Sequence, residues 1–313
     1  MPGSGRGSSL RPLALGRLLR LSLAPSALAD IAAGTLLGAG VWPSGAAPFL
    51  LMAGSACVYH GGMALNDWAD READARDRRP RPIPRGEIAP AFALTLAVLL
   101  LVAGPLLAWL ASPRAAACLG GVALLATLYD LAGRGPWLGP LLLGACRAGN
   151  LGAGLLLGAG LAGGAVPHWL PFAPVIYGSY VFSVSRLARL EDRAPSELPQ
   201  SRPERWLGLS ALLLVVHGLI GDWKHGHVDV PMRVAALAVA LWGAAGLLRA
   251  QPTGRAWTPG DAGRAAGMGL RRLLVGTSAL ALQSSAPHAY LVAGAILCGY
   301  PVSFALRKVF PPT

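Results

Sequence analysis

The residues best suited to chemistry lie in one short segment, which reads NDWADREAD from Asn66 to Asp74. On a helix, Asp67, Asp70 and Asp74 share one face because they are three and four residues apart, and Asn66 joins them. Three neighbouring carboxylates repel one another unless a cation neutralises them. Mg²⁺ binds through one or two carboxylates together with substrate phosphates. The spacing therefore predicts a Mg²⁺–diphosphate site. The alternative is a solvated helix end whose acids are balanced by nearby arginines.

An arginine- and proline-rich loop follows, with the sequence RRPRPIPRGEI over residues 78–88. Its prolines favour an extended backbone, because the ring fixes φ. Its arginines can donate paired hydrogen bonds to a phosphate, and we expect Arg79 to bind substrate in this way. The alternative is that the positive charges only anchor the loop beside the membrane. That explanation accounts for the arginines but not for the neighbouring aspartates.

A second polar set lies inside an apolar segment, residues 138–162. Arg147 is notable there, because a charged side chain within a membrane span is costly and almost always faces a cavity or a partner. Two roles are open: Arg147 reaches the diphosphate, or it pairs with Asp30. Asn150 lies near the same helix face, where it contacts substrate or makes a hydrogen bond between helices.

The elements that must position these residues are membrane helices. Of 313 residues, 54% are hydrophobic and 13% are charged, against about 25% charged residues in soluble domains. This composition argues against a soluble protein and against a disordered chain. A spanning helix needs about 20 mostly apolar residues. Nine segments meet that need: 22–42, 48–68, 90–111, 114–132, 138–162, 168–188, 205–221, 231–248 and 286–306.

The remaining apolar stretch, residues 264–283, carries three arginines: Arg264, Arg271 and Arg272. We expect it to form an interfacial or half-buried helix, with a tenth span as the alternative. Residues 1–20 form a basic tail. We expect no separate soluble domain, so residues 1–313 form a single membrane domain.

The net charge of +12 has two explanations, nucleic-acid binding or membrane topology. Most of the 27 basic residues gather in the tail and in alternate loops, which favours topology, and we expect no nucleic-acid partner. By the positive-inside rule those loops face the cytoplasm, and the aspartate segment lies on the same side. We expect a multi-pass protein of the inner or plasma membrane. The four cysteines lack metal-site spacing, which indicates packing roles.

The pattern NDxxDxxxD followed by RPxPIPxG, residues 66–74 and 79–86, resembles the first signature of the UbiA superfamily of intramembrane prenyltransferases. The resemblance covers nearly the whole chain and implies an all-α bundle of about nine membrane helices. It also implies that Asp67, Asp70 and Asp74 bind Mg²⁺ and an isoprenoid diphosphate.

Two further segments bear on this resemblance. The sequence CRAGN, residues 146–150, is similar to a segment of the EboC-like branch of the superfamily. Tyr129 and Arg134 precede it, and Arg134 stands where many members carry a basic residue. Typical members also carry a second aspartate motif after the sixth span. Here that region holds Glu191 and Asp192, which are adjacent and so point in different directions on a helix. The alternative for this pair is a loop balanced by flanking arginines.

The resemblance implies Mg²⁺-dependent transfer of an isoprenoid group from a prenyl diphosphate to an aromatic or other small hydrophobic acceptor, within membrane lipid. The catalytic residues would be Asp67, Asp70, Asp74 and Arg147. The substrate-binding residues would be Asn66, Arg79, Tyr129, Arg134, Asn150, Glu191 and Asp192. The departure in the second motif motivates an alternative, a non-catalytic UbiA-like protein that binds or moves a lipid-like or aromatic metabolite.

Overall fold

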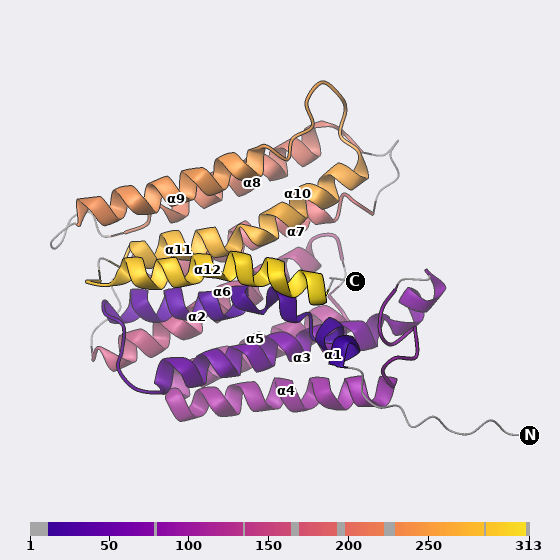
Figure 1. Cartoon of the computed structure of the whole chain (residues 1–313), viewed down its shortest axis with the longest axis horizontal. Coiled ribbons are helices and arrows are strands. Elements are labelled where there is room, and N and C mark those ends of the chain that lie inside the picture. Colours follow the sequence, from indigo (N-terminus) through magenta and orange to yellow (C-terminus); the bar gives the residue numbers. More distant parts are fainter. Residues whose placement is uncertain are drawn as a thin grey trace, which may run out of the picture.

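Long helices lying side by side make up the chain (Figure 1). The computed structural model describes residues 12–77, 80–133, 135–163, 169–192, 198–221, 229–284 and 286–310, and no strand occurs among them. The helices are α1 (Pro12–Leu18), the 3-10 turn η1 (Leu21–Leu23), α2 (Ala24–Ala39), α3 (Ala47–Arg76), α4 (Pro90–Ala111), α5 (Pro113–Leu131), α6 (Leu138–Leu161), α7 (Phe172–Ala188), α8 (Ser201–His217), α9 (Val230–Leu248), α10 (Pro259–Arg271), α11 (Leu273–Leu282) and α12 (Ala289–Val309).

Each of the nine predicted spans corresponds to one helix, which confirms the all-helical membrane bundle. Among the described residues, seven helices are long and apolar enough to cross a membrane: η1 with α2, α3, α4, α5, α6, α9 and α12. The other two predicted spans are α7 and α8, which have 17 residues each. Both are slightly shorter than the ~20 residues of a typical span.

The segment 264–283 differs from the expectation of one interfacial helix. It divides at Arg272 into the end of α10 and the whole of α11. Every residue of α11 is buried, whereas α10 buries only one face. The interfacial prediction is therefore wrong for α11. Apart from Thr277 and Ser278 its residues are apolar or glycine, which is typical of a helix that the protein surrounds on all sides.

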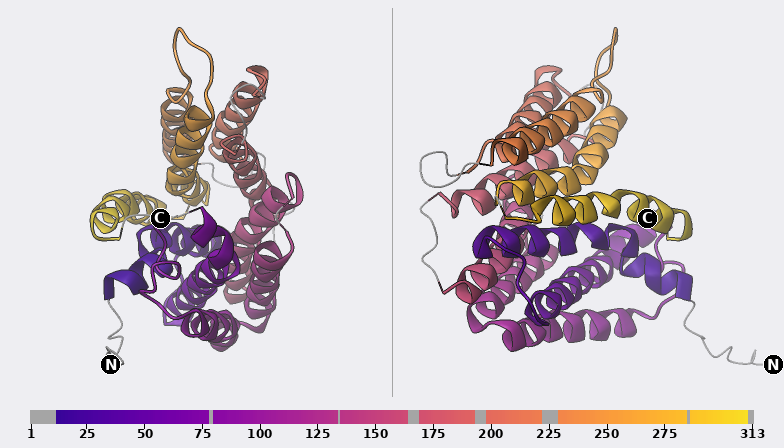
Figure 2. Two further views of the ribbon diagram at one scale, coloured as in Figure 1. Left: turned by 90° about the vertical axis from the view of Figure 1, so that its right-hand side faces the viewer. Right: turned by 60° about the vertical axis from the view of Figure 1, so that its left-hand side comes forward.

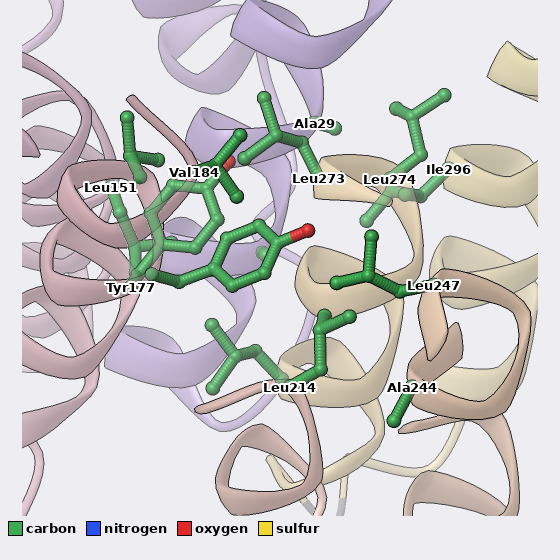
Figure 3. Close-up of a cluster of buried hydrophobic side chains, with 14 of the residues drawn as sticks. Ala29, Leu151, Tyr177, Val184, Leu214, Ala244, Leu247, Leu273, Leu274 and Ile296 are labelled. Atoms are coloured by element: carbon green, nitrogen blue, oxygen red, sulfur yellow. The ribbon is translucent and has the colours of Figure 1, made fainter. Parts of the chain in front are cut away.

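The helices form a closed series in which each packs on the next. Contacts run from α3 to α9 in chain order, α9 packs on α11, and α11 packs on α2. The left view of Figure 2 looks nearly along the axes of many of these helices. Because α2 also contacts α3, α6 and α12, it lies inside the bundle. The largest apolar core joins α2 and α6 to α7–α12, with Leu151, Tyr177, Leu214 and Leu273 among its residues (Figure 3).

The contact between α2 and α6 depends on glycines. A Cβ at Gly34 would lie 2.2 Å from the carbonyl oxygen of Leu151, and a Cβ at Gly158 would lie 2.2 Å from that of Thr35. Both atoms belong to backbone that cannot rotate away. Small residues allow this close approach, which is a common way for membrane helices to associate. This contact therefore fixes the position of α2 against α6.

Replacing Gly158 by alanine is expected to destabilise the protein by about 1–3 kcal/mol, because the new methyl group has no room in the close contact between α2 and α6. Thermal unfolding in detergent measures the effect as a lower midpoint. The matched control is Gly160→Ala on the same helix, where a Cβ meets nothing within 4 Å. Equal midpoints for the two variants would contradict close packing between α2 and α6.

Candidate functional site

The helical spacing predicted for the aspartates is present in the structure. Helix α3 continues beyond its apolar part to Arg76 without a break. Asp67 and Asp74, two turns apart on one face, are 1% and 3% exposed, and Asp70 between them is half-buried. The carboxylates therefore face the protein. The solvated helix end of the alternative is therefore wrong for Asp67 and Asp74, whereas nearby arginines do balance both carboxylates, as that alternative expected.

Arg81 neutralises this face from the loop that follows α3. Its Nη1 contacts Asp67 Oδ1, and its Nε lies 3.2 Å from Asp74 Oδ2. The loop is held over α3 by the buried side chains of Ile83 and Ile88. It turns at Gly86, whose φ of 68° lies in the left-handed region that glycine adopts without strain. The extended backbone expected from the prolines is wrong for residues 82–86, which form turns closed by hydrogen bonds such as that from Arg85 N to Arg81 O. The loop thus places a guanidinium between two carboxylates.

Arg20 provides a second positive charge from the segment that precedes η1 and α2. Its Nη2 lies 3.2 Å from Asp67 Oδ1 and donates to Asn66 Oδ1, also at 3.2 Å. Arg20 precedes η1 and has a φ of 48°, unusual for a residue with a side chain. The sequence placed it in the basic tail, and its local pattern carries no signal of this contact.

Asn66 links the aspartates to a second acid on α5. Its Nδ2 donates to Asp130 Oδ1 at 3.1 Å, and Asp130 is 3% exposed. Asp130 was not predicted as a site residue. Its position beside the predicted Tyr129, near the end of an apolar span, is the signal that could have identified it.

A cavity of about 290 Å³ lies between α2, α3, α5, α6, α7 and the α10–α11 junction. Most of its wall is apolar. Its polar lining comprises Arg20, Tyr59, Asn66, Tyr129, Asp130, Arg147 and Asn150, along with serines of α2, α3 and α7. The structure therefore brings together four residues predicted as site residues: Asn66, Tyr129, Arg147 and Asn150. The three aspartates of α3 adjoin this cavity through Asn66 but are not part of its lining.

Arg147 reaches the cavity from a buried polar network. Its Nη1 lies 3.2 Å from Asp30 Oδ2, and Asp30 has no exposed surface. Tyr177 Oη donates to Asp30 Oδ1 at 2.5 Å, and Asn150 Nδ2 donates to Asp30 Oδ2 at 3.0 Å. Asn150 also accepts a hydrogen bond from Ser55 at 2.7 Å. The pairing with Asp30 is thus present, and the bonds of Asn150 between helices are those of its alternative role. Arg147 nevertheless remains part of the cavity lining.

The other predicted residues do not join this cavity. Arg79 and Arg134 lie outside the described residues. Glu191 and Asp192 follow α7 in a turn, and both are exposed. Asp192 lies 3.9 Å from Arg189, as expected of a loop balanced by arginines. The carboxyl group of Glu191 lies beside Gly263 of α10, away from the cavity lining.

The donor atoms near Asp67 fit a divalent cation that shares its ligands with a substrate. Among the described residues, no group of three or more His, Cys, Asp and Glu side chains converges as a metal site. Asp67 Oδ2 is buried without a hydrogen-bond partner, an arrangement that is costly for a carboxylate oxygen. Mg²⁺ needs only one or two protein carboxylates when phosphate oxygens complete its coordination. Asp67 and Asp74 meet that requirement.

Solved structures with the same fold include UbiA homologues. A homologue from Archaeoglobus fulgidus bound to DMAPP and Mg²⁺ is 16% identical, with a TM-score of 0.63 over 94% of this chain and 99% of that one. A homologue from Aeropyrum pernix K1, in its apo form, is also 16% identical, with a TM-score of 0.58 over 90% of this chain and 98% of that one. At these identities the likeness concerns the fold.

Sequence relatives are prenyltransferases. A protoheme IX farnesyltransferase from an Anaeromyxobacter species is 35% identical over 59% of this chain and 64% of its own length. A digeranylgeranylglyceryl phosphate synthase from Methanothrix thermoacetophila is 46% identical over 20% of this chain and 24% of its own length. The chain therefore spans less than two thirds of either relative. Residues 27–259 match the UbiA prenyltransferase family, and these residues include the aspartate segment and the cavity residues of α3, α5, α6 and α7. The chain belongs to the UbiA prenyltransferase family.

Proposed function

We propose that this protein is a Mg²⁺-dependent prenyltransferase of the membrane, which moves an isoprenoid group from a prenyl diphosphate to an aromatic or other small hydrophobic acceptor. The observation that carries the proposal is the mostly apolar cavity, which adjoins the aspartates of α3 through the lining residue Asn66. The named relatives support a prenyl transfer reaction. The A. fulgidus homologue, bound to DMAPP and Mg²⁺, supports a prenyl diphosphate as donor and a divalent metal as cofactor.

The diphosphate end of the donor belongs at the aspartates. Asp67, Asp70 and Asp74 are the residues that would hold Mg²⁺, which when bound supplies positive charge to the leaving diphosphate. Arg20 and Arg81 bring two guanidinium groups to the same oxygen of Asp67, Oδ1. A guanidinium can donate two parallel hydrogen bonds to phosphate oxygens. Both arginines are therefore placed to bind the diphosphate beside the aspartates.

The hydrocarbon end of the donor belongs in the cavity. The bond between the first isoprenoid carbon and the diphosphate oxygen breaks, and its electrons leave with the diphosphate. Arg147 and Arg20 stabilise that negative charge from fixed positions, which is the most effective form of electrostatic catalysis. The face of Tyr129 can stabilise the carbocation. The acceptor forms the new bond and loses a proton, for which Asp130 is the carboxylate among the described lining residues.

One observation favours the non-catalytic alternative, in which the cavity binds or moves a lipid-like or aromatic metabolite. Glu191 and Asp192, the acids found where typical members carry the second motif, are exposed and do not line the cavity. Prenyl transfer releases diphosphate, whereas binding or transport does not, so diphosphate release separates the two functions. The EboC-like branch and the cytoplasmic orientation of the arginine-rich loops stay predictions.

Mg²⁺-dependent protection by prenyl diphosphates tests the donor site. We expect geranyl, farnesyl or geranylgeranyl diphosphate to raise the thermal unfolding midpoint only when Mg²⁺ is present. A ligand at a hundred times its Kd stabilises the folded state by about 2.7 kcal/mol. The comparison of chain lengths identifies the preferred donor. If no chain length shifts the midpoint with Mg²⁺ present, the donor site proposed here is wrong and the alternative function gains support.

A further inference from the structure

A second positively charged cavity lies apart from the central one. It has a volume of about 550 Å³ and lies where the turn before α6, the last turn of α7 and the first turns of α8 meet. We define this arginine–tryptophan pocket by its lining, which is Pro136, Trp137, Arg186, Arg202, Arg205, Trp206 and Leu209. It shares no lining residue with the central cavity, so the proposed transfer reaction does not account for it.

Arg186 is held in the pocket by aromatic rings. Its guanidinium carbon lies 3.8 Å from the ring centre of Trp137 and 5.2 Å from that of Trp206. Phe182 supports both rings, with centroid distances of 6.3 Å and 5.8 Å. Arg186 also donates to the carbonyl oxygen of Pro136. Arg186 is therefore oriented before any ligand arrives.

Arg202 and Arg205 add two positive charges from one face of α8. They share this face with Trp206 and Leu209, since residues three, four and seven apart lie together on a helix. Both arginines are exposed, and no ion pair joins either to another described residue. The described lining contains three arginines and no acid. The charge of the pocket is therefore complementary to an anion.

The face of α8 becomes apolar beyond the arginines. Leu209 is 38% exposed and Leu212, one turn further along the helix, is 59% exposed. In a membrane, exposed leucines contact hydrocarbon chains, and tryptophans favour the boundary between chains and headgroups. The order along α8 is arginine, tryptophan and then leucine. A phospholipid presents its phosphate, glycerol region and acyl chain in the same order, whereas free phosphate would use only the arginines.

We propose that the arginine–tryptophan pocket binds an anionic glycerophospholipid. The phosphate lies among Arg186, Arg202 and Arg205, and an acyl chain follows Leu209 and Leu212. Basic pockets between membrane helices are known to recognise anionic headgroups. This proposal is independent of the transfer reaction, because it concerns separate residues and a separate ligand.

Binding to the full-length protein in neutral detergent tests the proposal. The probes are phosphatidylglycerol, phosphatidylcholine and inorganic phosphate, each measured by titration and by thermal unfolding. We expect phosphatidylglycerol to bind and stabilise, with the other two showing no effect at the same concentration. The double variant Arg202→Gln/Arg205→Gln should weaken phosphatidylglycerol binding about thirtyfold, since each arginine near an anionic lipid contributes about 1 kcal/mol.

The matched control is Arg114→Gln/Arg249→Gln, which removes the same charge from two exposed arginines outside the pocket. This control should bind phosphatidylglycerol as the unmodified protein does. Equal losses in the two double variants would overturn the proposal in favour of a general effect of charge. Equal binding of phosphatidylcholine, or equal stabilisation by inorganic phosphate, would also overturn it. Protection by prenyl diphosphates should persist in both double variants, which separates this test from that of the transfer reaction.

Discussion

Replacing Asp67 by asparagine is expected to lower the rate of prenyl transfer by about a thousandfold. Metal coordination contributes several kcal/mol of charge stabilisation to a leaving group, and about 4 kcal/mol corresponds to that factor. Asp67 is the carboxylate on which Arg20 and Arg81 converge, and one of its oxygens is buried without a hydrogen-bond partner. Asparagine preserves its size but removes the negative charge that attracts the cation.

Transfer of a radiolabelled isoprenoid group measures this effect, and thermal unfolding checks that the variant is folded. Glu72→Gln is the matched control, because it also removes one carboxylate charge from α3 but from a side chain that is 75% exposed. We expect this control to retain full activity and full Mg²⁺-dependent protection by prenyl diphosphates. Full activity in Asp67→Asn would place the metal and diphosphate elsewhere in the protein.

Replacing Arg147 by glutamine is expected to remove both stability and activity. The change leaves Asp30 as a buried charge without its cation, and breaking a buried ion pair in this way costs about 3–5 kcal/mol. It also removes a positive charge from the cavity wall. The single variant alone therefore cannot separate a structural role of Arg147 from a catalytic one.

The double variant Asp30→Asn/Arg147→Gln makes that separation. It removes both charges together, so we expect the unfolding midpoint to recover most of what Arg147→Gln loses. Activity should stay low if Arg147 stabilises the leaving diphosphate. The matched single variant Asp30→Asn keeps the guanidinium and should retain much more activity than either Arg147 variant. Recovery of activity in the double variant would show that Arg147 acts only through its pairing with Asp30.

The aspartate site could be predicted because its geometry is local. Three carboxylates within eight residues must share a face if the segment is helical, and α3 is helical throughout. The arginines that neutralise them could not be predicted. Arg20 is 47 residues from Asp67 in sequence, and it reaches Asp67 because α1 and α2, the helices before and after it, both contact α3. No pattern in the sequence distinguishes it from arginines that only anchor the tail.

The membrane helices were predicted well because length and apolar composition decide them. The segment 264–283 was predicted less well, since its three arginines suggested a surface helix. All three lie outside α11, which is therefore free to be buried. The pairing of Arg147 with Asp30 was foreseen as one of two roles. Sequence alone could not choose between them, because one side chain can meet both a partner and a cavity.

The buried network around Asp30 also bears on how the chain is assembled in the membrane. Asp30 lies in the first spanning helix, whereas its partners Asn150 and Tyr177 follow 120 and 147 residues later. Synthesis proceeds from the N-terminus, so α2 is made long before α6 and α7 exist. An unpaired aspartate at the centre of a span costs about 2.5–3.5 kcal/mol on insertion scales. Helix α2 is consequently made before the partners of Asp30, and the arrival of α6 and α7 fixes it in the bundle.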